Sequence, residues 1–514
     1  MTIRESQPGQ IREGSQRGWM CAEGVSISLD DANSAWHCQT DRDRNRQEAR
    51  HVPRAPKEQN LRLRSLLDEA AMSNKGLARR IVDVAAVRGV QNVRCDHTSV
   101  LRWLAGEQPR SPVPELAAVV LGDALGRKVS ETELGMTPSD LPGDLGLQLP
   151  VGWTETIATS TALWRADVQR RRFLVNAVFT SAALPASALR WLTSPPAAAP
   201  SGSGARKVGR ADIDAIRELT HSYREMDNRL GGGKLRSSVV SYLDDHVSRL
   251  LTSGSYQEET GRQLAAACGE LSQLAGWVAY DSDEHGLAQR YLTQALAYSR
   301  HADDHALAAE VLAAQAHQAL YLARPDEAVD LARAAQAAAV RHGSATLLTE
   351  CLVMEAHGHA ARNDPSACGS ALARAEQTFD RAAREDDPAW LSYFDEAYLA
   401  ARMAQCFRDL GEAGHAARYA RRSLDMDGRY VRGRAFNLSL LATAYAAQDE
   451  PEQASVVGRQ ALDLTVRLTS ARSVRYVRDL VRVLRPRADV PAVRDFTAEV
   501  RERLPAAAGH AAPR

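Results

Sequence analysis

Small side chains recur at a nearly constant spacing over residues 258–504, and this spacing limits the possible folds more than any other feature of the chain. Six anchor positions lie 40, 40, 48, 38 and 39 residues apart, and small residues also stand twelve positions before and seven positions after most of them. The anchors are Ala288, Ala328, Cys368, Ala416, Ala454 and Val493; the earlier positions are Gly276, Ala316, Ala356, Ala404, Ala442 and Val481; the later positions are Ala295, Ala335, Ala375, Ser423, Ala461 and Val500. Two antiparallel helices approach closely only where small side chains face each other, and seven residues cover about two helical turns. The spacing therefore predicts consecutive helix pairs, with an atypical last pair as in a terminal repeat.

The pattern resembles tetratricopeptide repeats, whose helix pairs carry small residues at these offsets. The resemblance implies an α-solenoid with a concave surface. A standard unit has about 34 residues, so the longer spacing here predicts longer helices. An irregular bundle of Ala-rich helices would also make small residues common, and it is the alternative.

Composition supports an all-α fold. Aromatic residues make up only 5% of the chain, and strands draw on aromatic and β-branched residues. The apolar fraction of 44% and the charged fraction of 25% are typical of a soluble globular protein. The 64 basic and 64 acidic side chains cancel, so any attraction to nucleic acid must be local.

The chain divides into five segments by pattern. We expect a disordered N-terminal extension at 1–56, a small DNA-binding domain at 57–136, connector helices at 137–193, a flexible linker at 194–209 and a helical-repeat domain at 210–514. The linker prediction depends on the Pro-, Gly- and Ser-rich run from Ser194 to Gly204.

Compartment and membrane signals point to the cytoplasm. The seven cysteines are scattered without a Cys-x-x-Cys pair, so neither a disulfide framework nor a zinc site is indicated. Arg170–Arg172 precede a moderately apolar run, Val175–Leu192, but that run contains polar residues and a proline and makes a poor membrane span. We interpret it as buried or domain-packing helices.

The 57–136 segment predicts four short helices. The first is Leu61–Ala71, and the second runs from Lys75 to Val87 behind a cap at Ser73 or Asn74. Asp96 is a suitable N-cap for a third helix, His97–Ala105, which Gly106 closes. A fourth helix begins near Pro112 and Pro114.

This segment resembles the helix-turn-helix of phage-repressor-like (XRE-type) regulators in three runs: Leu77–Arg80, Asp96–Gly106 and Pro109–Arg110. The resemblance implies that the second helix buttresses the third, whose N-terminal residues read base edges in the major groove of double-stranded DNA. Residues 57–110 hold ten basic and six acidic side chains, a net charge of +4 that opposes −4 in the remainder. The expected DNA-contacting residues are His97, Thr98, Ser99 and Arg102 at the bases, with Arg79, Arg80 and Arg110 on phosphates.

The turn departs from this family. A tight helix-turn-helix joins its helices with three or four residues, whereas Arg88 to Cys95 intervene here. The insertion motivates the alternative function, a helical-repeat adaptor that sequesters a protein partner without specific DNA binding.

Three further runs, Leu163–Asp167, Arg172–Leu174 and Tyr223–Gly233, resemble a group of actinobacterial regulators that join such a helix-turn-helix to a tetratricopeptide-like half. Members include a negative regulator of sporulation and antibiotic production. The resemblance implies a cytoplasmic, homodimeric repressor of developmental and antibiotic-biosynthesis genes. Its repeat half would bind a peptide, small ligand or protein.

No catalytic or cofactor signature is evident. Gly231–Lys234 lacks the Ser or Thr of a phosphate loop, and we interpret the glycines as a flexible hinge. His301 with His305, and His357 with His359, do not match a zinc motif. We therefore expect no enzyme activity, no cofactor and no metal.

Overall fold

The computed structural model describes residues 59–87, 93–109, 112–127, 129–131, 133–136, 144–169, 179–195 and 197–504. Helices dominate these residues, so the prediction of an all-α chain is confirmed at that level. The predicted disordered extension, 1–56, lies outside the described residues, as does the Arg110 side chain.

The described residues of the N-terminal module, 59–136, form four helices close to the predicted bounds. They are α2 (Leu61–Glu69), α3 (Asn74–Val87), α4 (His97–Leu104) and α5 (Val113–Leu125). Leu63, Leu77, Ile81, Val100 and Leu121 are fully buried in a shared core, because each helix turns one apolar face inward.

The connector helices do not form a separate layer. They are α6 (Trp153–Gln169) and α8 (Ala183–Thr193). Trp164 of α6 and Leu184 of α8 are fully buried in cores shared with the helices that follow. The side chain of Gln289 bonds both the backbone N–H and the backbone C=O of Thr180, at 2.9 and 2.7 Å. The predicted boundary near residue 209 is therefore not a packing boundary.

The predicted flexible linker needs a correction. Within it, β1 (Gly202–Ser203) pairs antiparallel and β2 (Arg206–Lys207) pairs parallel with β3 (Gly254–Tyr256), giving a small sheet in the order β1-β3-β2. The glycine at 202 permits this approach, since a Cβ there would lie 2.5 Å from the carbonyl oxygen of Gly254. Sheet pairing, which composition does not reveal, orders these residues.

A long helix and four short helical segments precede the helix pairs. They are α9 (Arg210–Leu230), the 3-10 turn η1 (Gly232–Lys234), α10 (Arg236–Tyr242), the π-turn η2 (Leu243–Val247) and α11 (Ser248–Ser253). Asp212 accepts a hydrogen bond from the backbone N–H of Gly209 at 3.0 Å, which helps to fix the start of α9.

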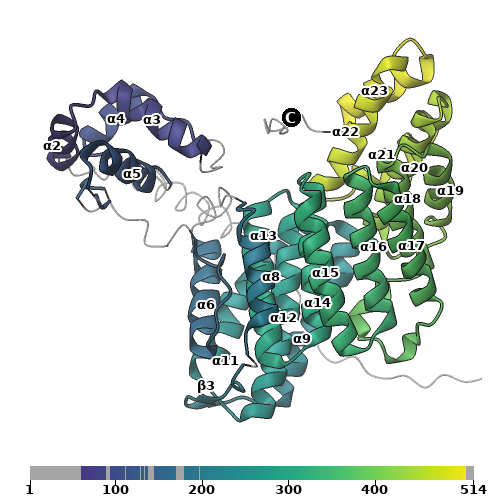
Figure 1. The fold of residues 1–514 in the computed structure, drawn as a ribbon, viewed down its shortest axis with the longest axis horizontal. Coiled ribbons are helices and arrows are strands. Elements are labelled where there is room, and N and C mark those ends of the chain that lie inside the picture. Colours follow the sequence, from purple (N-terminus) through teal and green to yellow (C-terminus); the bar gives the residue numbers. More distant parts are fainter. Residues whose placement is uncertain are drawn as a thin grey trace, which may run out of the picture. The chain divides into compact units, whose positions relative to one another are not determined.

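Twelve α-helices follow as six consecutive pairs, here called the helix-pair region (Figure 1). The pairs are α12 (Glu258–Asp281) with α13 (His285–Ala302), α14 (His305–Tyr321) with α15 (Pro325–His342), α16 (Ala345–Ala361) with α17 (Pro365–Phe379), α18 (Glu396–Asp409) with α19 (Ala413–Arg422), α20 (Val431–Ala447) with α21 (Pro451–Thr465), and α22 (Ala471–Leu484) with α23 (Pro491–Arg503). The two helices pack tightly against each other in the first five pairs, whereas in the last pair α22 packs mainly on α20 and α23 mainly on α21. All six anchors lie in the first turn of the second helix of a pair, and all are at most 1% exposed. Most of the flanking small positions are buried as well, and Val481 in the last pair is only half-buried.

Most of the turns between the two helices of a pair have the same backbone conformation. Five of them place a single residue in the left-handed region between the two helices, which reverses the chain within three residues. These residues are Asp283, Ala323, Asn363, Gly411 and Asp449, with φ of 66°, 56°, 58°, 76° and 61°. After such a turn the two helices of a pair lie close together. A Cβ added at Gly276 of α12 would lie only 2.8 Å from Cγ of Leu292 on α13.

Candidate functional site

The start of α4 is fixed by its cap. The carboxylate of Asp96 accepts hydrogen bonds from the backbone N–H and the hydroxyl of Ser99, both at 2.8 Å. These bonds lower the pKa of Asp96. The predicted cap is therefore confirmed.

The predicted DNA-contacting residues of α4 separate into two groups. His97, Thr98 and Arg102 are exposed, whereas Ser99 is only 8% exposed and its hydroxyl is engaged by Asp96. Ser99 thus supports the helix start, while its three neighbours offer side chains to the surface. A residue that caps a helix and a residue that reads a base look the same in sequence, since both are polar and lie in the first turn.

Arg79 and Arg80 are exposed on α3, the helix that packs on α4. Leu77 and Ala78, next to them in sequence, are buried in the module core. The position of the seventh predicted contact, Arg110, is not described.

A second candidate site is a cavity of about 630 Å³ in the helix-pair region. The first helix of every pair contributes to its wall, and α9 and two loops complete it. Sequence patterns did not predict these residues, because the periodic small positions lie between helices and the cavity is lined by non-periodic ones.

One of the two loops that line the cavity lies where the repeat departs from its period. The interval of 48 residues contains an insertion, 380–395, between α17 and α18, and it places Trp390 and Tyr393 at the cavity. The connection between α19 and α20 contributes Met426 and Tyr430. The irregular spacing was thus the one sequence signal that could have located the cavity.

A group of polar side chains that line the cavity are hydrogen-bonded to one another. The hydroxyl of Tyr393 lies 2.8 Å from Oε2 of Glu310 and 2.8 Å from Oε2 of Glu350. Gln273 donates to Oε1 of Glu310 at 3.1 Å, and the hydroxyl of Tyr398 lies 3.4 Å from Oε1 of Glu350. Burial raises the pKa of both glutamates, and the nearby Glu310 carboxyl adds to the rise for Glu350. The two acids therefore tend to hold a proton.

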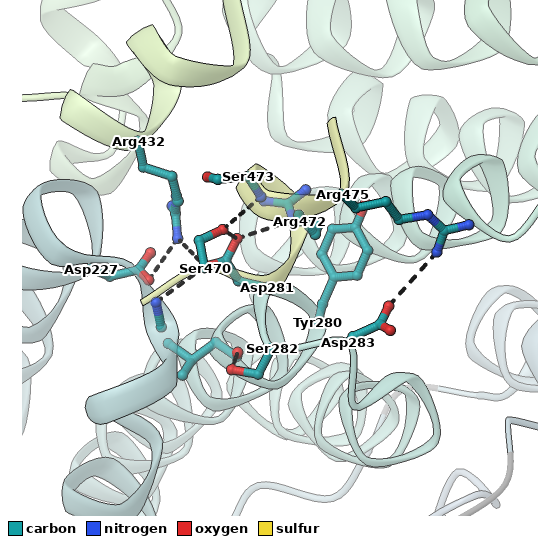
Figure 2. Close-up of polar contacts among 12 residues, drawn as sticks. Asp227, Tyr280, Asp281, Ser282, Asp283, Arg432, Ser470, Arg472, Ser473 and Arg475 are labelled. Carbon is teal, nitrogen blue, oxygen red and sulfur yellow. Dashed lines mark hydrogen bonds and ion pairs between the residues drawn. The ribbon is translucent and has the colours of Figure 1, made fainter. Parts of the chain in front are cut away.

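A buried ion cluster fixes α9 to three other helices (Figure 2). Asp281, at the end of α12, accepts hydrogen bonds from Nε of Arg472 at 3.1 Å and from the hydroxyl of Ser470 at 2.9 Å. Arg432 of α20 lies 2.6 Å from Asp227 of α9 and 3.5 Å from Asp281. Burial alone would raise the pKa of Asp281, but Arg432 and Arg472 outweigh it and lower that pKa.

Aromatic rings surround one of these cations. The guanidinium carbon of Arg472 lies 4.2 Å from the ring centre of Tyr280, 4.8 Å from that of Phe436 and 5.2 Å from that of Trp277. Ring faces attract cations by their quadrupole. The arrangement joins α22 to α12 and α20 beside the cavity.

The glycines after α9 are packed tightly, which corrects the prediction of a flexible hinge. Gly232 donates its backbone N–H to Asp281 at 3.1 Å, and Gly233 donates to the carbonyl of Thr469 at 2.8 Å. A Cβ at Gly233 would lie 2.7 Å from that carbonyl oxygen. The glycines are therefore required by close approach, and they hold the end of α9 against the turn before α22.

Neither a metal site nor a membrane span is found in the described residues. No group of three or more His, Cys, Asp and Glu side chains there could hold a metal ion. The helices described are all too short or too polar to cross a bilayer. The predicted packing role of the moderately apolar run is confirmed for α8, whose Leu184, Ala188 and Trp191 are buried.

Comparison with known proteins extends to the N-terminal module alone. Residues 63–137, which include α3, α4 and α5, match the family described as SP15 N-terminal domain. No curated protein and no solved structure matches the chain. The module is thus similar to a recurrent domain, and the cavity has to be interpreted from its own chemistry.

Proposed function

We propose that this protein is a DNA-binding transcriptional regulator in which the N-terminal module contacts DNA as an XRE-type helix-turn-helix. The observation that carries the proposal is the short capped helix α4, which exposes His97, Thr98 and Arg102 in a segment of net charge +4. In this proposal Thr98 and Arg102 reach base edges, and Arg79 and Arg80 neutralise phosphates. Ser99 would act by fixing the start of the helix.

The helix-pair region serves as a tetratricopeptide-like sensor in this proposal. A cavity of about 630 Å³ lies within the range of small-ligand sites. Ligand binding would change DNA affinity if it favours one of two arrangements of the chain. The resemblance to actinobacterial regulators supports a cytoplasmic homodimer that represses developmental and antibiotic-biosynthesis genes.

Genome-wide DNA capture, followed by binding titrations at several salt concentrations, tests the DNA-binding role. Arg102→Ala should weaken binding to the captured sites by about 1–3 kcal/mol and relax their sequence preference. Arg79→Ala should weaken binding to all sequences alike and reduce the salt dependence by about one phosphate contact. Arg64→Ala, which removes an exposed charge from α2, is the matched control and should leave sequence preference intact.

Weak, equal binding to all sequences that Arg102→Ala leaves unchanged would refute specific readout. The sign of regulation is tested separately, by transcript levels of the captured genes in a deletion strain. Repression predicts that these transcripts rise.

A second candidate function is an adaptor that sequesters a protein partner. The observation in its favour is the separation of α3 and α4, since residues 88–96 intervene where a tight turn needs three or four. Pull-down would then recover one stoichiometric partner, and a chain lacking residues 57–136 would keep its activity. Loss of activity in that deletion would exclude the adaptor.

A further inference from the structure

Two arginines at the cavity, Arg402 and Arg224, have no carboxylate oxygen of the described residues within ion-pair distance. Arg402 is 5% exposed, and its guanidinium donates to Oε1 of Gln405 at 3.0 Å and to the hydroxyl of Tyr398. Arg224 of α9 makes contacts of only 3.4 and 3.5 Å, with the side chain of Gln273 and a backbone carbonyl. Within the described part of the chain, neither guanidinium forms an ion pair within 4.0 Å. A buried charge without a partner is costly.

The neighbouring acids cannot fully balance these cations. Tyr393 has a single hydroxyl proton, so it cannot donate to Glu310 and Glu350 at the same time. If one carboxyl keeps a proton, it can donate a hydrogen bond itself and the repulsion between the acids is removed. Burial raises the pKa of both acids, in agreement with this arrangement. Arginine does not lose its proton in proteins, so a Glu310–Glu350 pair that keeps one proton offers the two guanidinium groups a single negative charge.

Several other ionisable groups near the two acids are already paired or neutral. Glu270 of α12 lies 3.3 Å from Arg217 and its charge also acts on Arg224, whereas Arg472 and Arg432 are balanced by Asp281 and Asp227. Burial holds the pKa of His317 far below its usual value and the pKa values of Tyr393 and Tyr398 above theirs. On α16, the carboxylate of Glu355 lies 2.8 Å from Arg333, and His357 bonds to Asp409 at 2.9 Å. Arg402 is therefore the cation without a carboxylate of its own, and Arg224 shares Glu270 with Arg217.

The rest of the cavity wall is apolar and aromatic. Leu274, Ala314 and Met354 lie on successive first helices, and Trp277 and Trp390 add ring surfaces. A volume of about 630 Å³ exceeds what a lone inorganic anion needs and suits an organic molecule.

We propose that the cavity binds a small organic carboxylate with a ring-bearing apolar body, held at its carboxylate by Arg402 and Arg224. A guanidinium fork matches a carboxylate in geometry and charge, and the tryptophans pack against the body. The proposal deepens the sensor role of the helix-pair region and rests on it. It is independent of whether the N-terminal module contacts DNA.

Binding of an anion should be coupled to protonation. A bound carboxylate favours the protonated form of the Glu310–Glu350 pair, so the complex takes up protons. Affinity should therefore rise as the pH falls from about 8 to about 6, where aromatic carboxylates themselves stay ionised. An amine would show the opposite trend.

Calorimetric titration of the purified full-length chain tests the proposal with matched ligands. The probes are two triads, benzoate with benzamide and benzylamine, and 2-naphthoate with 2-naphthamide and 2-naphthylmethylamine. At least one carboxylate should bind about tenfold or more tightly than its amide, and the amines should bind least, because a hydrogen bond to a charged group contributes about 1.5–3 kcal/mol.

Arg402→Gln should reduce carboxylate affinity about 10- to 100-fold and leave amide affinity unchanged. Arg224→Gln, a change in the part of α9 that lines the cavity, is a second variant in case the first does not fold, and it should act in the same direction. Arg501→Gln, an exposed change in α23, is the control and should have no effect.

Equal affinities for carboxylate and amide, or a preference for the amine, would overturn the proposal. Absence of binding by both carboxylates at millimolar concentration would overturn it as well. DNA is absent from these titrations, so failure here is distinguishable from failure of the DNA-binding role.

Discussion

Replacing Asp281 by asparagine should release α9 from the helix-pair region. The substitution keeps the shape of the side chain but removes the negative charge that faces Arg432 and Arg472, at 3.5 and 3.1 Å. Breaking a buried ion pair from one side costs about 3–5 kcal/mol. Asparagine retains some hydrogen bonds and Asp227 still compensates Arg432, so we expect the lower end, about 3 kcal/mol.

Hydrogen exchange measured by mass spectrometry is the suitable assay, because a long helix-pair array need not unfold in one step. A loss of about 3 kcal/mol corresponds to roughly a hundredfold faster exchange through local opening. The effect should concentrate in α9 and the start of α22, since Asp281 bonds Gly232 after α9 and Ser470 before α22. Asp214→Asn, which removes half of an exposed pair with Arg210, should leave exchange unchanged.

Unchanged protection of α9 in the Asp281→Asn variant would refute this reasoning, and so would a loss spread evenly over all six pairs. The wild-type chain should show the same local release at acid pH. Folding lowers the pKa of Asp281 below its ordinary value of 3.8, so its contribution is complete above that value and is lost as the pH falls through the folded pKa.

Three further changes test packing and ionisation. Gly276→Ala should destabilise the chain by about 1–3 kcal/mol in thermal melts, because its Cβ would clash across the α12–α13 contact, whereas Gly369→Ala meets nothing within 4 Å and should be neutral or slightly stabilising. Glu350→Gln should raise the melting temperature at about pH 8 more than at about pH 4. Folding raises the pKa of this carboxyl, so its contribution to stability is lost as the pH rises. An equal shift of the melting temperature at both pH values would argue against a buried ionisable group. Burial lowers the pKa of His301 from 6.5 to about 4, so its contribution is complete above pH 6.5 and is lost as the pH falls through about 4. His301→Asn should remove that part of the acid transition followed by circular dichroism, and an unaltered transition would contradict the assignment.

Local pattern accounted for much of the helix-pair region and of the N-terminal module. The anchors Ala288, Ala328 and Ala454 are all fully buried at helix contacts, as their spacing predicted. Asp96 caps α4 as predicted. Both inferences concern residues that interact within one helix or with the adjacent one, so periodicity and turn chemistry suffice to find them.

Predictions that required knowledge of distant contacts were less successful. The linker prediction missed the pairing of Gly202 with Tyr256, and the hinge prediction missed the packing of Gly233 against Thr469. Glycine-rich segments look flexible in sequence whether they are free or closely packed. Only the neighbouring backbone distinguishes the two cases.

The sequence by itself determined the helical class, the pairing of successive helices and the position of a small basic module, because each depends on residues a few turns apart. Only the tertiary structure brought Glu310, Tyr393 and Arg402 to one cavity and joined Asp227 to Arg432 across 205 residues of chain. Those side chains follow no period. They come together because the six helix pairs pack side by side and α9 packs against them. The chemistry of the cavity therefore exists only in the folded chain.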